Sequence, residues 1–170
     1  MENSDSTSTQ AIDKEEVIIN ELIKLLNGGN AHASFEEAIK SLPFSILGTK
    51  VDQLPYTIWQ LIEHIRITQW DILEFSKSPS HESPEWPDEY WPEHLKPIDE
   101  TEWKGSLQQI QNDKQEFIEL LKNRSNNIYE SFPYGSGQNL IREGMLIADH
   151  TSYHIGQIIL IRKLLGDWKN

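Results

Sequence analysis

Hydrophobic residues recur every three or four positions in four long stretches of the chain, which is the spacing of amphipathic helices. These stretches are residues 13–27, 56–75, 99–125 and 138–165. Pro55 stands where a first-turn proline would begin the second helix, and Gly166 follows the fourth helix as its stop. The motif Ser34-Phe-Glu-Glu37 predicts a short additional helix that ends before Pro43. No stretch combines alternating hydrophobicity with flanking turns, so no strand is predicted.

A segment rich in proline and aromatic residues, 77–98, separates the second stretch from the third. It contains five prolines and is too long for a tight turn between antiparallel neighbours. We therefore expect a crossover loop, held against the body by Trp86, Tyr90 and Trp91, with the second and third helices parallel. This arrangement predicts an all-α fold, a four-helix bundle with a long Trp/Pro-rich crossover between its second and third main helices.

The 170 residues are enough for one domain with a single hydrophobic core. Residues 1–11 are rich in serine, threonine and asparagine without periodicity, so we expect a disordered N-terminal tail followed by one domain over 12–170. The chain has no cysteine. Disulfide scaffolds, thiolate zinc sites and a sulfur nucleophile of the chain's own are therefore excluded.

The chain is strongly acidic, with 27 aspartates and glutamates against 15 lysines and arginines and a net charge of −12. A field of this sign repels phosphate, so we expect neither a nucleic-acid partner nor binding to anionic membranes. No apolar run approaches the roughly 18 residues of a membrane-spanning helix. The polar start MENSDSTSTQ lacks the features of a secretion signal, so a cytoplasmic protein is expected.

Three of the six histidines fall on apolar helix faces. His150 and His154 are four residues apart and share one face of the last helix, while His64 lies in an apolar stripe of the second. Burying three imidazoles is costly unless each finds a partner. A divalent ion such as zinc or nickel would satisfy all three and leave a position open for water or substrate, whereas the alternative is that waters or carbonyls satisfy them. His81 and His94, in the polar crossover, are expected to be solvated.

Other polar residues lie near these histidines along the same helices. Gln60 and Gln157 are within about one turn of a histidine, and we interpret them as hydrogen-bond partners of the ligands or of a substrate. Asp71 and Glu143 lie further out and are weaker candidates for a general base. His32 follows a Gly-Gly turn, and its role is left open, with a solvated loop histidine as the simpler interpretation.

The segments that carry the histidines resemble those of the DinB/YfiT-like superfamily, bacterial four-helix bundles named for their induction by DNA damage. The similar segments are Trp59-Gln-Leu-Ile-Glu-His64, Ala148-Asp-His-Thr-Ser-Tyr-His154-Ile-Gly-Gln157, Pro84-Glu-Trp-Pro-Asp-Glu-Tyr-Trp-Pro92 and Asn27-Gly-Gly-Asn-Ala-His32. The resemblance covers nearly the whole chain. It implies an up-down-down-up bundle with a triad of His64, His150 and His154 that binds a divalent ion, often nickel or zinc.

The resemblance also implies an enzyme that uses the ion to activate a water or a cosubstrate thiol, as a hydrolase or a thiol S-transferase. Because the chain has no cysteine, the thiol would come from a low-molecular-weight partner such as bacillithiol, mycothiol or glutathione. The alternative is a non-catalytic bundle that binds a small molecule or a metal, its pocket covered by tryptophans such as Trp86, Trp91 and Trp103. The family's bundles often pair, so the resemblance also implies a homodimer.

Overall fold

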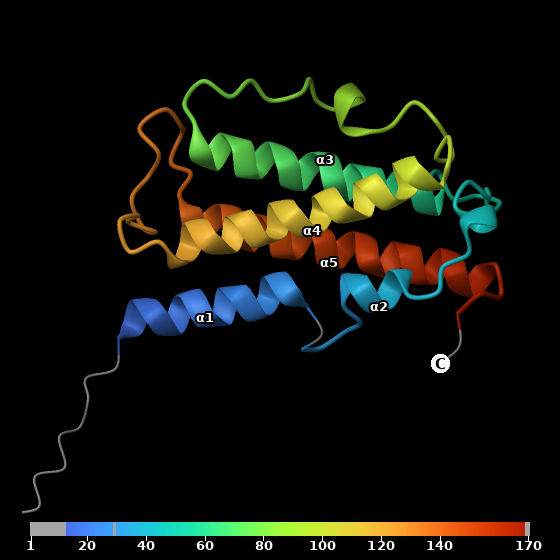
Figure 1. Ribbon diagram of the computed structural model, residues 1–170, viewed down its shortest axis with the longest axis horizontal. Helices are drawn as coiled ribbons and strands as arrows, with labels where there is room; N and C mark the ends of the chain where they lie inside the picture. Colours follow the sequence, from blue (N-terminus) through green and yellow to red (C-terminus); the bar gives the residue numbers. More distant parts are fainter. Residues whose placement is uncertain (1–12, 29, 169–170) are drawn as a thin grey trace, which may run out of the picture.

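The computed structural model describes residues 13–28 and 30–168 (Figure 1). Within these ranges the chain forms five α-helices and two short 3-10 helices without a strand, so the prediction of an all-α fold is confirmed. The elements are α1 (Lys14–Asn27), α2 (Phe35–Ile39), η1 (Phe44–Ile46), α3 (Ile58–Lys77), η2 (Asp88–Tyr90), α4 (Glu100–Lys122) and α5 (Leu140–Leu164). The tail predicted at residues 1–11 lies outside the described residues.

Acidic side chains cap two of the long helices at the first residue of the predicted stretch. The carboxylate of Asp13 accepts hydrogen bonds from the backbone N–H groups of Glu15 and Glu16, at the start of α1. Asp99 caps α4 in the same way. Each cap satisfies N–H groups that have no partner within the helix.

The start of α3 differs from the prediction, because Thr57 caps this helix and Pro55 lies two residues before the cap. The Thr57 hydroxyl oxygen accepts from the backbone N–H of Gln60 at 3.2 Å, and Oε1 of Gln60 accepts from the backbone N–H of Thr57 at 3.1 Å. The same hydroxyl donates to the Leu95 carbonyl at 2.7 Å. This reciprocal cap therefore also ties the end of the crossover to the start of α3.

The helices lie side by side along the long axis of the molecule. In Figure 1, α1 and α5 run in one direction and α3 and α4 in the other, and residues 78–99 return along the length of α3 before α4 begins. α3 packs against both α4 and α5, and α1 packs against α5 and α4. The α3/α5 contact therefore brings together the helices that carry the three candidate ligands. None of the described helices is long and apolar enough to cross a membrane.

The hydrophobic core has two parts that meet along α5. One part includes Trp59 of α3 and Ile155 of α5. The other includes Phe117 of α4 and Ala148 of α5. Residues 149–154, which contain two of the candidate ligands, therefore lie between the two parts of the core.

The crossover is anchored by two of the three aromatic residues that the sequence suggests. Tyr90 is buried, and Trp91 is half-buried, with its ring stacked on Tyr56 at a centroid distance of 4.0 Å and an interplanar angle of 6°. The anchoring role expected for Trp86 is wrong, because this side chain is 69% exposed. Its ring lies 5.3 Å from that of Tyr90 in an edge-on arrangement, on the outside of the loop.

Two glycines of α5 should respond in opposite ways to alanine. A Cβ at Gly144 would lie 2.8 Å from Cδ2 of Leu22 and 3.1 Å from Cε1 of Phe117, whereas one at Gly156 would meet nothing within 4 Å. Gly156→Ala should raise the free energy of unfolding by about 0.5–1 kcal/mol through helix propensity. The free energy of unfolding of Gly144→Ala should be about 1–3 kcal/mol lower than that of Gly156→Ala, because overpacking opposes the same gain in helix propensity. Urea denaturation measures both, and equal stabilisation would contradict the close packing of α5 on α1 and α4.

Candidate metal centre

Three histidines converge between α3 and α5. Nε2 of His150 lies 3.0 Å from Nε2 of His64 and 3.1 Å from Nε2 of His154. His64 and His154 are buried, at 2% and 5% exposure, and His150 is half-buried. Among the described residues these three form a group whose ligand atoms could hold one metal ion.

The outer nitrogens of two rings have hydrogen-bond partners that orient them. Nδ1 of His64 lies 2.8 Å from the backbone carbonyl oxygen of Tyr90, and Nδ1 of His154 lies 2.6 Å from Oε1 of Gln157. Both partners are acceptors, so each Nδ1 carries the proton and donates it. Each Nε2 is then left with a lone pair directed towards the centre of the group, which is the tautomer that metal-binding histidines adopt.

A cation would satisfy this arrangement better than a proton can. The single N–H that His150 could place on Nε2 lies between the lone pairs of His64 and His154, and a neutral ring can fully satisfy only one of them. Tetrahedral coordination at about 2.0–2.1 Å places two ligand nitrogens roughly 3.3–3.4 Å apart, a few tenths of an ångström beyond the observed separations. The donor set and its spacing therefore fit a divalent ion after a small outward movement of the rings.

All three histidines are held in the neutral form that metal binding requires. Burial lowers the pKa of His64 and of His154 below the usual histidine value. The pKa of His150 is lowered to about 3, first by burial and then by repulsion from His154 and His64. Near pH 7 no proton therefore competes with a metal for these lone pairs.

Aromatic rings cover the group on two sides. Trp91 stacks on His64 at a centroid distance of 3.9 Å and an interplanar angle of 6°, and Tyr56 stacks on the other side of Trp91. The ring of Tyr153 meets His154 edge-on at 4.9 Å. These contacts limit rotation of the imidazoles.

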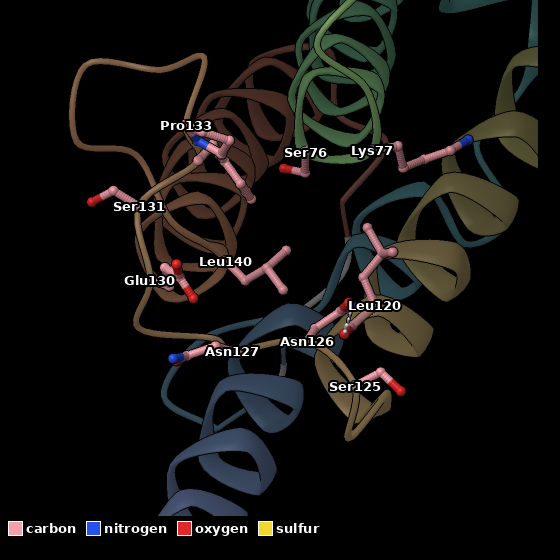
Figure 2. A pocket seen from close by; sticks show the side chains of 11 residues that line it. Ser76, Lys77, Leu120, Ser125, Asn126, Asn127, Glu130, Ser131, Pro133 and Leu140 are labelled. Carbon is pink, nitrogen blue, oxygen red and sulfur yellow. Dashed lines mark hydrogen bonds between the residues drawn. The ribbon is translucent and has the colours of Figure 1, made fainter.

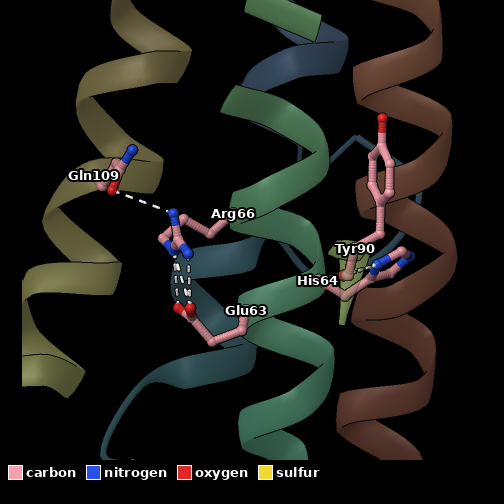
Figure 3. A network of polar contacts seen from close by, with 5 residues as sticks. All are labelled: Glu63, His64, Arg66, Tyr90 and Gln109. Carbon is pink, nitrogen blue, oxygen red and sulfur yellow. Dashed lines mark hydrogen bonds and ion pairs between the residues drawn. The ribbon is translucent and has the colours of Figure 1, made fainter. Parts of the chain in front are cut away.

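The nearby acidic residue Glu63 points away from the group. Figure 3 shows His64 on the α5 side of α3, whereas Glu63 and Arg66 lie on the α4 side. Both carboxylate oxygens of Glu63 accept from Nε of Arg66 at 3.0 Å, and Arg66 also donates to Gln109 at 3.3 Å. Glu63 therefore balances a cation at the α3/α4 contact and does not complete the histidine group.

The two glutamines and the two acids named from the sequence have different places. Gln157 contacts His154, but the side chain of Gln60 is used in the cap of α3. The carboxylate of Glu143 is buried and paired with the neighbouring Arg142, and burial raises its pKa. None of the hydrogen bonds of the described residues joins Gln60 or Glu143 to the three histidines.

Asp71 belongs to a polar network that holds the crossover. Its Oδ2 accepts from the Tyr90 hydroxyl at 2.6 Å, and its Oδ1 lies 2.8 Å from Nε2 of His81. The expectation that His81 is solvated is therefore wrong, because the loop folds back onto α3 and partly buries it. His94 and His32 are exposed and stand apart from the histidine group.

The Tyr90 carbonyl is the functional group that the sequence analysis missed. Tyr90 is named there only as a loop anchor, whereas its backbone oxygen determines the tautomer of a ring on another element. Backbone carbonyls leave no trace in residue identity. The aromatic cluster around residue 90 is the one available signal that this part of the loop is buried.

A cavity of about 400 Å³ lies at the end of the bundle where α3 and α4 finish and α5 starts (Figure 2). Two of its polar side chains have partners within the protein. Asn126 donates to the Leu120 carbonyl, and Lys77 pairs with Glu74 and Glu116. This cavity therefore presents no convergent set of ligand atoms comparable with the three histidines.

Acidification should destabilise the metal-free protein through His150. Because its pKa is about 3 in the folded state and about 6.5 when unfolded, the unfolded chain binds the proton first, and stability is lost as the pH falls below about 6.5. In EDTA, the free energy of unfolding of the wild type should fall relative to that of His150→Gln between pH 6.5 and 5. One titrating group limits this difference to about 1.4 kcal/mol per pH unit. Urea denaturation at each pH measures it, with exposed His94→Gln as the control, and parallel curves would contradict the assignment.

Comparison with known proteins gives one result that agrees with this geometry. A family model, the DinB superfamily, matches residues 30–158, about three quarters of the chain, and this range contains all three histidines. No curated protein and no solved structure gives a significant match. The all-helical fold and the matched range lead to the same assignment, and the chain belongs to the DinB superfamily.

Proposed function

We propose that this protein is a metal-dependent enzyme in which His64, His150 and His154 hold a divalent zinc or nickel ion. The observation that carries the proposal is the convergence of three histidine Nε2 atoms between α3 and α5, two of which present lone pairs to the same point. When bound, such an ion lowers the pKa of a water or a thiol and makes a nucleophile available near neutral pH. The substrate is a small molecule, and the reaction is hydrolysis or transfer of a low-molecular-weight thiol.

The chain's own residues would serve this reaction by orientation. The Tyr90 carbonyl and the Gln157 amide oxygen hold two of the rings, so the ligands need little reorganisation. The NH₂ group of Gln157, on the far side of the same amide, would donate a hydrogen bond to a substrate oxygen. Because the chain has no cysteine, the nucleophile comes from outside the chain, as a water or a cosubstrate thiol.

The buried acids are not assigned to proton transfer. Both carboxylate oxygens of Asp71 are engaged by Tyr90 and His81, and Glu143 is paired with its neighbour Arg142. Their roles are to hold the crossover on α3 and to balance charge within α5. We therefore propose that proton transfer involves the nucleophile and the leaving group, without a dedicated carboxylate base.

Loss of one histidine should remove the metal without unfolding the bundle. Untagged wild-type protein, purified without a nickel column, should contain close to one zinc or nickel per chain by plasma mass spectrometry. His154→Ala should weaken metal binding by more than the roughly 10–100-fold that loss of a ligand's hydrogen-bond partner costs. Its helical circular dichroism should persist, because apolar side chains such as Trp59, Ile155 and Phe117 make up the two parts of the core.

His94→Ala is the matched control, because His94 is exposed in the crossover and should keep the wild-type metal content. Wild-type metal occupancy in His154→Ala would contradict the ligand assignment. Unfolding of His154→Ala, His64→Ala and His150→Ala alike would indicate that the histidines are structural. Turnover that is lost on chelation and restored by Zn²⁺ or Ni²⁺ would separate an enzyme from a binding protein.

Tyr90 should influence the metal from outside the ligand set. Tyr90→Phe removes the hydroxyl that donates to Asp71, so the carbonyl that orients His64 is held less firmly. We expect metal affinity to fall about three- to tenfold, less than the loss of a direct partner would cause. Competition with a chromophoric chelator measures it. Tyr129→Phe, at an exposed tyrosine, should leave the affinity unchanged, and equal effects of the two variants would exclude this role.

A further inference from the structure

A small apolar cavity opens beside the histidine group, at the end of the seam where α3 begins and α5 ends. Its volume is about 90 Å³. Its wall includes Pro55, Tyr56, Leu61, Gln157, Leu160 and Ile161. Leu61 and Ile161 are buried and form its deeper wall, whereas Pro55 is exposed and Leu160 is 49% exposed. The cavity therefore lies at the surface of the bundle, where a ligand can enter it.

Two residues of the cavity wall also belong to the surroundings of the histidine group. Gln157 lines the cavity and also contacts Nδ1 of His154 at 2.6 Å. Tyr56 lines it and stacks on Trp91, which in turn stacks on His64. Along α5 the cavity and the histidine group are a short distance apart, because Gln157 lies three residues, or roughly 4.5 Å of helix rise, beyond His154.

The opposite end of the same seam contains charged side chains. About two turns from the histidines in the other direction, the lining of a cavity of about 190 Å³ includes the charged Asp71, Arg142 and Glu143, together with apolar side chains such as Ile72 and Phe75. A ligand lying at the histidines therefore has an apolar cavity on one side and a cavity with three charged side chains on the other. This asymmetry favours one orientation for a molecule with a hydrocarbon end.

We propose, on the basis of the function proposed above, that the apolar cavity receives a compact aliphatic group of the substrate while the reacting group lies at the histidines. At about 90 Å³ the cavity is well below the roughly 300–1,000 Å³ that encloses a whole drug-sized ligand, so it fits a side group of a few carbons. Gln157, at the boundary, separates the polar from the apolar part of the substrate. The substrate class is then a small molecule with a short alkyl or branched alkyl end.

Straight-chain alkyl hydroxamic acids provide the test, because the hydroxamate group binds divalent metals and the alkyl chain can be lengthened one carbon at a time. With zinc-loaded protein, isothermal titration calorimetry should show affinity rising about three- to fourfold for each added methylene and then levelling off after a few carbons. A flat series with measurable binding of acetohydroxamic acid would overturn this inference and leave the metal site intact. Failure of the protein to bind zinc would overturn the proposed function as well.

Two leucines on the same helix give a matched pair of variants. Leu160→Asp places a carboxylate in the wall of the cavity. Leu164→Asp places a carboxylate one turn further along α5, at a side chain that is 57% exposed and is not part of the cavity lining. Leu160→Asp should abolish the gain per methylene and keep wild-type binding of acetohydroxamic acid, and Leu164→Asp should keep both. Leu160→Asn gives the same test without a charge if Leu160→Asp fails to fold. Equal chain-length dependence in the wild type and both folded variants would place the alkyl chain elsewhere and overturn the proposal.

Discussion

Three neutral imidazoles packed between α3 and α5 impose the constraint on which the rest of the site depends. Two of them must point their Nδ1 protons outwards to find acceptors, so their lone pairs face one another across His150. A hydrophobic seam normally excludes such groups because their polar atoms lose water. The surrounding structure meets this cost with specific acceptors on the outside, and the remaining unsatisfied lone pairs are what make the group suited to a cation.

The crossover is part of this arrangement. A loop of some twenty residues would ordinarily be free to move, but this one returns along α3 and places a backbone carbonyl and an indole ring against His64. Asp71 of α3 holds it there through the Tyr90 hydroxyl and His81. The link between the second and third long helices thus completes the surroundings of a ligand.

The α3/α5 seam is therefore graded along its length. An apolar cavity at Leu61 and Ile161 is followed by the histidines and then by the buried acids at Asp71 and Glu143. The order follows from antiparallel packing, because residues that precede His64 on α3 face residues that follow the histidine pair on α5. One contact between two helices thus places apolar, metal-binding and charged surfaces in a row.

The sequence by itself determined the helices and the grouping of the histidines. Hydrophobic periodicity of 3–4 residues specifies which helix face is buried, and a histidine on that face must point inwards with it, as His64 and His154 do. Tertiary structure alone decided what surrounds them: the Tyr90 carbonyl, the burial of His81 and the exposure of Trp86. These depend on how a segment without periodicity folds back onto α3. A backbone oxygen has the same chemistry at every residue, so only its position in space gives it a role.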